Sequence, residues 1–307
     1  MSSVKPVGRF APTPSGRMHL GNVFAALLSY LAARSGDGSL ILRMEDLDKQ
    51  RTKPEYAEVL RRDLAWLGFD YDTESQPQSQ RDDIYEIYFQ KLMETGLLYP
   101  CYCTRAQLHS VNAPHASDGT YVYPGTCRNL TPRQRQQMTR LPSWRLQVPD
   151  RVWRLNDKIQ GHYQENLCFD CGDMVLRRGD GAFLYQLAVT VDDGLSGVNQ
   201  VVRGVDLLSS APRQMYLQEL LGFAHPEYAH VPLLVAPDGR RLSKRDKDMD
   251  LGFLQSRLSA WQLLGILAQA AGLIAKAEPV SARELIGEFS WQKLRKENIC
   301  IDIAPFL

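Results

Sequence analysis

Residues 7–22, VGRFAPTPSGRMHLGN, decide the fold of this 307-residue chain. Val7 to Ala11 is a short apolar run that predicts a β-strand, and the Pro and Gly residues behind it break the chain. A helix is expected from Asn22 to Arg34, where Ala and Leu recur at helical spacing, and Gly36 ends it. The next run, Ser39 to Met44, is typical of a buried parallel strand. This order predicts a βαβ unit whose helix N-terminus can bind an anion.

Further helices and strands are expected along the chain, interrupted by one irregular stretch. From Cys101 to about Gln147 the regular spacing is lost, which indicates an inserted module. The expected helices are Lys53 to Leu67, Asp83 to Thr95, Pro212 to Leu221 and Ala260 to Ala271, and the expected strands are Val198 to Arg203 and His230 to Val235. We therefore expect four parts: the first half of a Rossmann-type core at residues 1–98, the inserted module at 99–180, the second half at 181–250 and a helical segment at 251–307.

Composition limits the partners. Lys and Arg total 36 and Asp and Glu total 35, which gives a net charge of +1. This balance disfavours partners that need a wholly basic surface, such as bulk DNA or an anionic membrane. The sequence has no apolar run of about 18 residues and no secretory pattern at its N-terminus, so we expect neither a transmembrane helix nor a leader. These features favour a cytoplasmic location, and a monomer is expected, although the oligomeric state has no signal of its own in the sequence.

Two motifs far apart in the chain carry the functional signal. One is Phe10-Ala-Pro-Thr-Pro-Ser-Gly16 with His19-Leu-Gly-Asn22, and the other is Arg241-Leu-Ser-Lys-Arg245. In this order they resemble the "HIGH" and "KMSKS" motifs of class I aminoacyl-tRNA synthetases, in the glutamyl and glutaminyl version. Similarity to glutamyl-tRNA synthetases continues in residues 184–193, 202–207 and 211–214. The resemblance spans Arg9 to Arg245 and implies an α/β Rossmann-type catalytic core with an insertion.

The expected chemistry explains the first group of candidate residues. Activation of an amino acid joins two anions, a carboxylate and the α-phosphate of ATP, so the site must supply positive charge and positioning. A helix N-terminus at His19 offers backbone N–H groups, and Gly21 permits close approach of the nucleotide. The resemblance places ATP, with Mg²⁺, against His19, Gly21, Asn22, Ser243 and Lys244. The alternative for Lys244 is a solvated lysine in a basic loop.

Selection of glutamate needs a cation for its side-chain carboxylate, and Arg binds a carboxylate through two parallel hydrogen bonds. The resemblance implies that Arg9 and Arg203 contact that carboxylate, that Glu45 holds the α-ammonium group and that Tyr185 supplies a hydroxyl. The residues at the end of the first strand and just after it complete the glutamate pocket that the resemblance implies: Phe10, Ala11, Pro12 and Thr13. A solvated strand end for Glu45 and core packing for Tyr185 are the alternatives.

A cysteine cluster lies in the inserted module. Cys101, Cys103 and Cys127 offer three thiolates, and a closed structural zinc site takes four ligands. The residues alone favour His115 or His109 as the fourth ligand. The resemblance changes this expectation, because glutamyl-Q tRNA(Asp) synthetases carry Cys-x-Cys and Tyr-x-x-x-Cys with the Tyr as a zinc ligand. The stretch Tyr123-Pro-Gly-Thr-Cys127 matches that spacing.

The alternative for the cluster is three thiols that bind no metal. The remaining cysteines carry weaker signals than the cluster. Cys168 and Cys171 have C-x-x-C spacing without a second pair, so a structural or incidental role is expected. Cys300 is expected to be a buried apolar residue.

Length points to the type of synthetase. Only 62 residues follow Arg245, whereas a glutamyl-tRNA synthetase continues into a helical anticodon-binding domain that needs roughly 100 residues or more. A core without that domain is the pattern of the glutamyl-Q tRNA(Asp) synthetases. They activate L-glutamate with ATP in the absence of tRNA and attach it to the queuosine base at the wobble position of tRNA-Asp.

Two other functions remain open at this stage. One is a minimal glutamyl-tRNA synthetase that charges the terminal adenosine of tRNA-Glu, and the other is a non-catalytic paralogue that binds tRNA or a regulatory partner. The module and the C-terminal helices are the expected tRNA-facing surface. Arg133, Arg135 and Arg140 are its candidate phosphate contacts, although exposed arginines are commonly only solvated.

Overall fold

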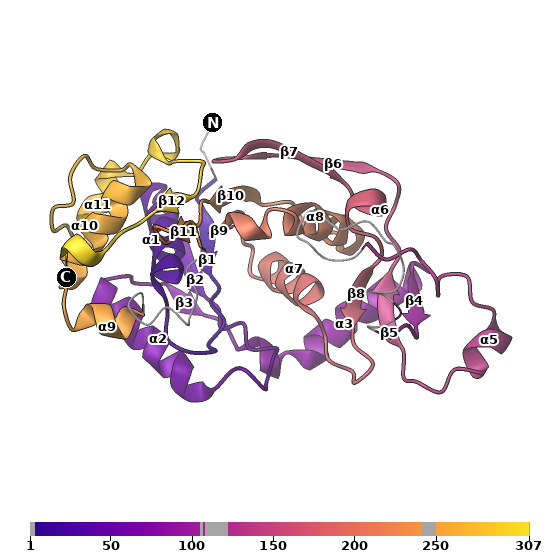
Figure 1. Cartoon of the computed structure of the whole chain (residues 1–307). Helices are drawn as coiled ribbons and strands as arrows, with labels where there is room; N and C mark the ends of the chain where they lie inside the picture. Colours follow the sequence, from indigo (N-terminus) through magenta and orange to yellow (C-terminus); the bar gives the residue numbers. More distant parts are fainter. Residues whose placement is uncertain (1–3, 105–106, 108–121, 241–249, 307) are drawn as a thin grey trace.

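The computed structural model describes residues 4–104, 107, 122–240 and 250–306. Its centre is a set of parallel strands: β1 (Val7–Phe10), β2 (Ser39–Leu42), β3 (Thr73–Glu74), β9 (Gln200–Gly204) and β10 (Glu227–Val231). In the register, Arg9 lies opposite Ile41 and Arg203 lies opposite His230. The backbone N–H of Asn199 donates to the carbonyl of Val7 at 3.1 Å, so β9 runs beside β1 (Figure 1). The spatial order is therefore β3-β2-β1-β9-β10, the arrangement of a doubly wound fold.

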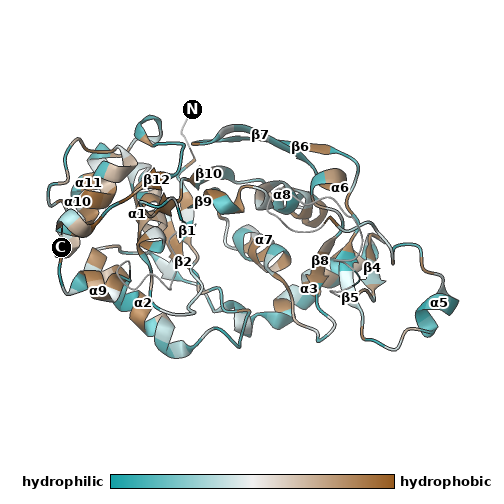
Figure 2. Ribbon diagram, in the orientation of Figure 1, coloured by the Kyte–Doolittle hydropathy of each residue, from teal (hydrophilic) through white to brown (hydrophobic). Residues whose placement is uncertain are grey.

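Helices cover both faces of these strands. One face carries α1 (Leu20–Ser35), α2 (Pro54–Leu67), α10 (Ala260–Ala271) and α11 (Ala282–Glu288), and the other carries α3 (Asp82–Glu94), α7 (Tyr185–Leu195) and α8 (Ser210–Leu221). Side chains alternate between the two cores as a pleated strand requires: Leu40 and Leu42 pack on the first, and Ile41 on the second. The apolar residues gather where these helices meet the strands, whereas α5 is hydrophilic (Figure 2).

The expected βαβ unit is confirmed in β1, α1 and β2. The expected helices 53–67, 83–95, 212–221 and 260–271 are also present, with boundaries that move by two residues or fewer. The single strand expected from His230 to Val235 is wrong. It divides into β10 and β11 (Leu234–Val235), because Pro232 has no backbone N–H for a ladder. β11 pairs instead with β12 (Ile299–Cys300).

A second body lies at the far end of α3. Strands β4 (Leu98–Cys101), β5 (Ser143–Leu146) and β8 (Met174–Arg177) form its antiparallel sheet, with α5 (Pro132–Gln136) at its tip and α6 (Leu167–Asp170) nearby (Figure 1). A long hairpin of β6 (Val152–Asp157) and β7 (Gly161–Asn166) runs from this body back to the core. The backbone N–H of Lys158, in the hairpin turn, donates to the Tyr228 carbonyl at 2.9 Å. The hairpin thus ties the inserted module to β10.

The C-terminal part is helical, as expected. It contains α9 (Leu251–Gln255), α10 and α11, and two of these helices begin at Ser capping boxes, Ser259 for α10 and Ser281 for α11. Among the helices in the described part of the chain, none combines the length and the apolar character needed to cross a membrane.

Candidate active site

A cavity of about 510 Å³ opens where β1, β2, β9 and β10 end. This is the carboxyl edge of the parallel strands, at the point where the strand order reverses between β1 and β9, and ligands of doubly wound folds bind there. The cavity wall includes every sequence-predicted glutamate and ATP residue of the described ranges: Arg9, Phe10, Ala11, Pro12, Thr13, His19, Gly21, Asn22, Glu45, Tyr185 and Arg203.

The second motif has flanks at the same cavity. Ser243 and Lys244 lie outside the described residues, together with the rest of residues 241–249. Leu234, which precedes them, lines the cavity, and Asp250, which follows them, forms a β-bridge with His19. A residue before the motif thus lines the cavity, and a residue after it pairs with a residue of the cavity wall.

The N-terminus of α1 faces the cavity with a defined His19 tautomer. The His19 ring caps the helix, since its Nδ1 accepts a hydrogen bond from the backbone N–H of Gly21 at 3.1 Å. The Asn22 side chain completes a capping box by accepting from the backbone N–H of His19 at 3.3 Å. In the neutral ring the proton is therefore on Nε2, which makes His19 a hydrogen-bond donor. A donor at a positive helix end suits a phosphate.

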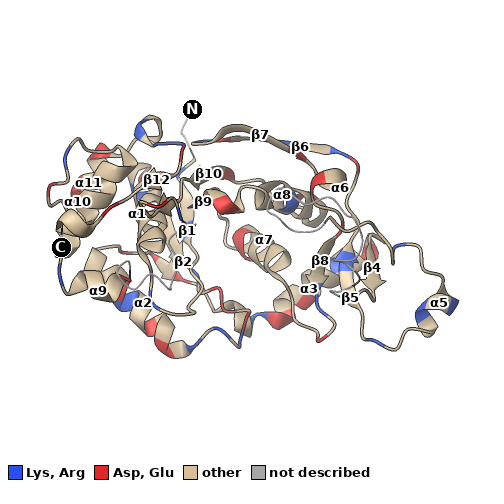
Figure 3. Cartoon of the chain, viewed as in Figure 1, with Lys and Arg blue, Asp and Glu red and all other residues tan. Residues whose placement is uncertain are grey.

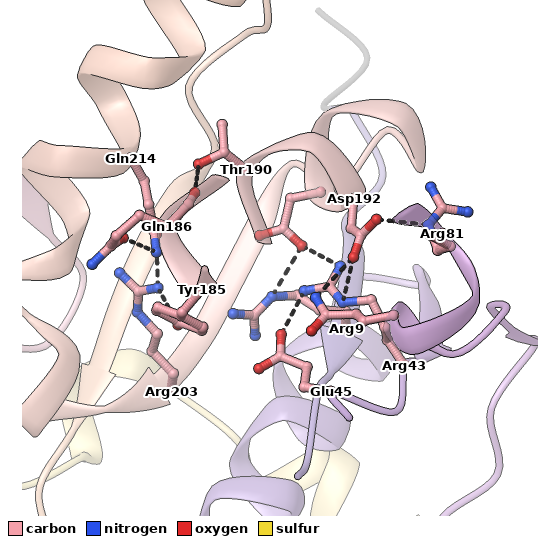
Figure 4. A network of polar contacts seen from close by, with 12 residues as sticks. Arg9, Arg43, Glu45, Arg81, Tyr185, Gln186, Thr190, Asp192, Arg203 and Gln214 are labelled. Carbon is pink, nitrogen blue, oxygen red and sulfur yellow. Dashed lines mark hydrogen bonds and ion pairs between the residues drawn. The ribbon is translucent and has the colours of Figure 1, made fainter. Parts of the chain in front are cut away.

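A buried charge network, two of whose members belong to the cavity wall, links β1, β2 and α7 (Figure 4). Arg43 is 1% exposed and contacts Asp193 at 2.6 Å and Glu45 at 3.1 Å. Arg9 lies 3.6 Å from the same Asp193 oxygen. Burial alone would raise the pKa of Asp193, but Arg43 and Arg9 hold it below its ordinary value, so this carboxylate stays charged. The network anchors the strand ends to α7.

The neighbouring Asp192 joins α7 to α3. It accepts hydrogen bonds from Gln78 at 2.8 Å, from Arg81 at 2.8 Å and from the Tyr85 hydroxyl at 2.9 Å. Three donors satisfy the buried carboxylate, so α7 has a fixed position relative to α3 and the turn before it.

Arg203 has a different environment from Arg9 and Arg43. It is 5% exposed, and its Nη1 donates to Gln214 at 2.8 Å and to the Tyr185 hydroxyl at 3.4 Å, while its Nε donates to His230 at 3.0 Å. Within the described ranges no carboxylate lies at ion-pair distance from Arg203, and its Nη2 has no hydrogen-bond partner. A buried cation at a cavity wall whose hydrogen-bond partners are all neutral, and which keeps one nitrogen unpaired, calls for an anionic ligand.

Two further groups of the wall have shifted pKa values. Burial raises the pKa of Glu45, against the opposing effects of Arg43 and Arg9, and burial raises the pKa of Tyr185. Tyr185 therefore stays a neutral hydroxyl at pH 7, available as donor or acceptor beside Arg203.

Sequence reasoning missed Arg43, Asp193, Gln214 and His230. Arg43 had a visible signal, because an arginine inside an otherwise apolar buried run needs a partner. The other three lie in helical or strand contexts where nothing local distinguishes them from ordinary polar residues.

The cysteine cluster forms a second candidate site in the inserted module. The Sγ atoms of Cys101, Cys103 and Cys127 lie within 4.8 Å of one another. The Tyr123 hydroxyl lies 3.3 Å from Cys101 Sγ and 3.7 Å from Cys103 Sγ, and Cys103 and Cys127 Sγ are 3.6 Å apart. Ligands of a tetrahedral zinc with Zn–S of about 2.3 Å are roughly 3.8 Å apart. Four donor atoms thus converge with spacings that fit a zinc ion.

The surroundings of Tyr123 favour a bound cation. Burial raises the pKa of its hydroxyl, so a phenolate forms only against a positive charge. The backbone N–H of Cys127 donates to the phenol oxygen at 2.9 Å, and the Arg145 guanidinium lies 3.8 Å from the ring centre. Both would stabilise a phenolate. His115 and His109, the alternatives considered from the residues alone, lie outside the described residues.

The other cysteines form no site with these thiols. Cys168 and Cys171 are half-buried at α6, and the potential metal ligands that cluster in the described part of the chain do not include them. The expectation for Cys300 is wrong, since its side chain is exposed on the short strand β12.

The module is positively charged on its outer side. Residues 122–149 contain five arginines and neither Asp nor Glu. Arg128 pairs with the buried Asp173 at 2.7 Å, whereas Arg133 and Arg140 are exposed at and beyond α5. In Figure 3, α5 carries Lys or Arg colour and no acidic colour. This tip offers positive charge to an external anion in a chain of nearly zero net charge.

Comparisons with known proteins agree with this geometry. Residues 5–268 match the family described as tRNA synthetases class I (E and Q), catalytic domain. The Glutamyl-Q tRNA(Asp) synthetase of Nitratidesulfovibrio vulgaris is 44% identical over 92% of this chain and 91% of its own length. That of Symbiobacterium thermophilum is 44% identical over 96% and 95%. The crystal structure of a glutamate tRNA ligase from Elizabethkingia meningosepticum with its amino acid superposes with a TM-score of 0.83 at 29% identity, covering 97% of this chain and 67% of that chain.

Proposed function

The chain belongs to the class I tRNA synthetases of the glutamate and glutamine type, and from this premise we propose that it activates L-glutamate with ATP and transfers the glutamyl group to the queuosine base of tRNA-Asp. The proposed reaction has two steps. A glutamate carboxylate oxygen attacks the α-phosphorus of ATP and pyrophosphate leaves. A nucleophile on the queuosine base then attacks the acyl carbon of the adenylate and AMP leaves.

One observation carries the choice of an acidic amino acid. Arg203 lines the cavity, and among the described residues its hydrogen-bond partners are Gln214, Tyr185 and His230, while its buried Nη2 has no partner. A substrate carboxylate would satisfy that nitrogen and the charge together, whereas a glutamine amide would satisfy only the hydrogen bond. We assign Arg203, with Arg9, to the side-chain carboxylate of glutamate. Glu45, whose side chain is 12% exposed, is assigned to the α-ammonium group.

The other cavity residues are assigned to the nucleotide. The N-terminus of α1 and the donor Nε2 of His19 would stabilise negative charge on the phosphates, and Gly21 leaves room for close approach. Loss of one such donor costs about 10²–10³ in rate. Ser243 and Lys244 are proposed for the pyrophosphate side on the resemblance of their motif alone.

The cysteine cluster is proposed to hold one structural zinc through Cys101, Cys103, Tyr123 and Cys127. Its four donors converge with suitable spacing, and a bound zinc would stabilise the module that carries the exposed arginines. We propose Arg133, Arg135 and Arg140 as contacts to the tRNA backbone.

The test has two stages. Purified protein is assayed for ATP–pyrophosphate exchange with glutamate, glutamine or aspartate, without tRNA, and exchange is expected with glutamate. Radiolabelled glutamate is then offered with queuosine-containing tRNA-Asp, queuosine-free tRNA-Asp and tRNA-Glu. Labelling of only the first tRNA supports the proposal, and exchange that prefers glutamine contradicts it.

The second candidate is charging of tRNA-Glu, which the similarity to a glutamate tRNA ligase structure favours. Glutamate bound to the terminal adenosine of tRNA-Glu, released by mild base and absent from tRNA-Asp, would establish this function instead.

A further inference from the structure

We infer that Asp157 and His230 form a positioning relay that holds Arg203 in the orientation that binds the glutamate side chain, so that the β6–β7 hairpin of the inserted module takes part in amino-acid recognition. The inference rests on the proposed function, because it assumes that Arg203 binds a substrate carboxylate. It concerns two residues that make no contact with the cavity themselves.

The relay is a continuous line of buried contacts. His230 Nδ1 lies 2.6 Å from Asp157 Oδ2, and His230 Nε2 lies 3.0 Å from Arg203 Nε. The side chains of Asp157 and His230 are both 0% exposed. Backbone N–H groups of Ile159 and Gln160 donate to Asp157 Oδ1 at 2.9 Å each, which fixes the carboxylate. The backbone of the turn thus positions Asp157, Asp157 positions the His230 ring, and the ring positions Arg203.

Chemistry then determines the tautomer of His230. The Arg203 Nε carries a proton that it cannot lose, so His230 Nε2 must accept that hydrogen bond. The remaining ring proton is on Nδ1 and points to Asp157. A neutral ring in this tautomer offers the guanidinium a lone pair without cancelling its charge. Arg203 is therefore held in place and still requires an anionic ligand. An acidic residue in place of His230 would itself compensate the charge of Arg203 and remove that requirement.

The hairpin supplies the first member from outside the strands that form the cavity. Asp157 ends β6, and the following turn is docked on β10 by Lys158 through its backbone N–H to Tyr228 and by Gln160 through its side chain to the His230 carbonyl at 2.9 Å. In Figure 1 the hairpin runs from the body of β4, β5 and β8 to β10, the strand that pairs with β9, on which Arg203 lies.

The test uses the full-length chain and steady-state ATP–pyrophosphate exchange. Asp157→Asn keeps the shape but can donate to Nδ1 and so permits the wrong tautomer, with Nε2–H against Arg203. We expect the KM for glutamate to rise about tenfold or more, with the KM for ATP unchanged and kcat within about threefold. His230→Leu should act in the same way, and His230→Gln, whose carbonyl oxygen can accept from Arg203, should recover most of the loss. Lys158→Gln, in the same turn but in an exposed ion pair with Glu227, is the matched control.

The outcomes separate the two proposals. Wild-type protein without glutamate-dependent exchange defeats the proposed function. Active wild-type protein together with an unchanged KM for glutamate in Asp157→Asn and His230→Leu overturns the relay, as does an equal rise of both KM values. Nitrogen-15 NMR of the histidine side chains in the wild type gives a readout that needs no variant to fold. A His230 ring protonated on Nδ1 is expected, and a ring protonated on Nε2 would overturn the inference.

Discussion

The buried His230 makes folding stability depend on pH in a way that can be calculated. Burial, aided by the charges of Arg203 and Arg9 and opposed by Asp157, lowers its pKa from 6.5 to about 4. In the unfolded chain the ring regains a proton below pH 6.5, whereas in the folded chain it stays neutral until about pH 4. The unfolded state therefore binds more protons in this window, and the stability that the neutral ring confers is present above pH 6.5 and lost as the pH falls towards 4.

The magnitude follows from these two values. At 1.36 kcal/mol per pKa unit, the loss between pH 7.5 and pH 5 is about 2 kcal/mol. Asp157 does not titrate in this window, because His230 and backbone N–H groups hold its pKa below the ordinary value despite burial. Urea unfolding of wild-type protein and His230→Gln, followed by circular dichroism at both pH values, measures the difference. The wild type should lose about 2 kcal/mol more than the variant.

A control separates this effect from general acid sensitivity. His162, on strand β7 of the same hairpin, is exposed, so His162→Gln should lose as much stability as the wild type. Equal losses in the wild type and His230→Gln would show that the ring is not held neutral, and the tautomer argument would fail with it.

Three other perturbations test the buried network and the metal site. Asp193→Asn removes the carboxylate that faces Arg43 and should lower the free energy of unfolding by about 3–5 kcal/mol in urea titrations, and a change below about 1 kcal/mol would refute the role of the pair. Cys101→Ser should reduce the zinc content measured by plasma mass spectrometry, and an unchanged metal content would mean that the ligand set is different. Gly172→Ala should also release metal, because its backbone φ is +68° and an added Cβ would lie 2.6 Å from a backbone nitrogen of the cluster. Gly68→Ala, with φ of +76° and no atom within 4 Å, should keep the metal.

The sequence predicted the local features of the fold because they depend on local signals. Strand, loop and helix order around residues 7–44 follows from apolar spacing and from Pro and Gly, and the structure agrees within two residues at most of these ends. The cavity wall could be predicted for a related reason. Its residues follow strand ends or begin a helix, and the carboxyl ends of parallel strands meet at one edge of a sheet.

Pairings between distant residues could not be predicted in this way. Arg43 and Asp193 are 150 positions apart, and Asp157 and His230 are 73 apart. Their contacts exist because the strands align and the hairpin turn docks on β10, which no local pattern encodes. Cys300 shows the same limit, since an isolated cysteine favours burial on average and only the position of β12 exposes it.

The docking of the β6–β7 hairpin has a consequence for the size of the smallest working enzyme. A designer who removed residues 99–180 to obtain a bare Rossmann-type ligase would also remove Asp157 and the turn that covers His230. The remaining core could keep its strands and helices, but the imidazole would be exposed to water and could protonate on either nitrogen. The insertion and the core are distinct parts of the fold, but residues of both position the substrate-binding arginine. In chimeras between related proteins, the two parts must therefore be exchanged together.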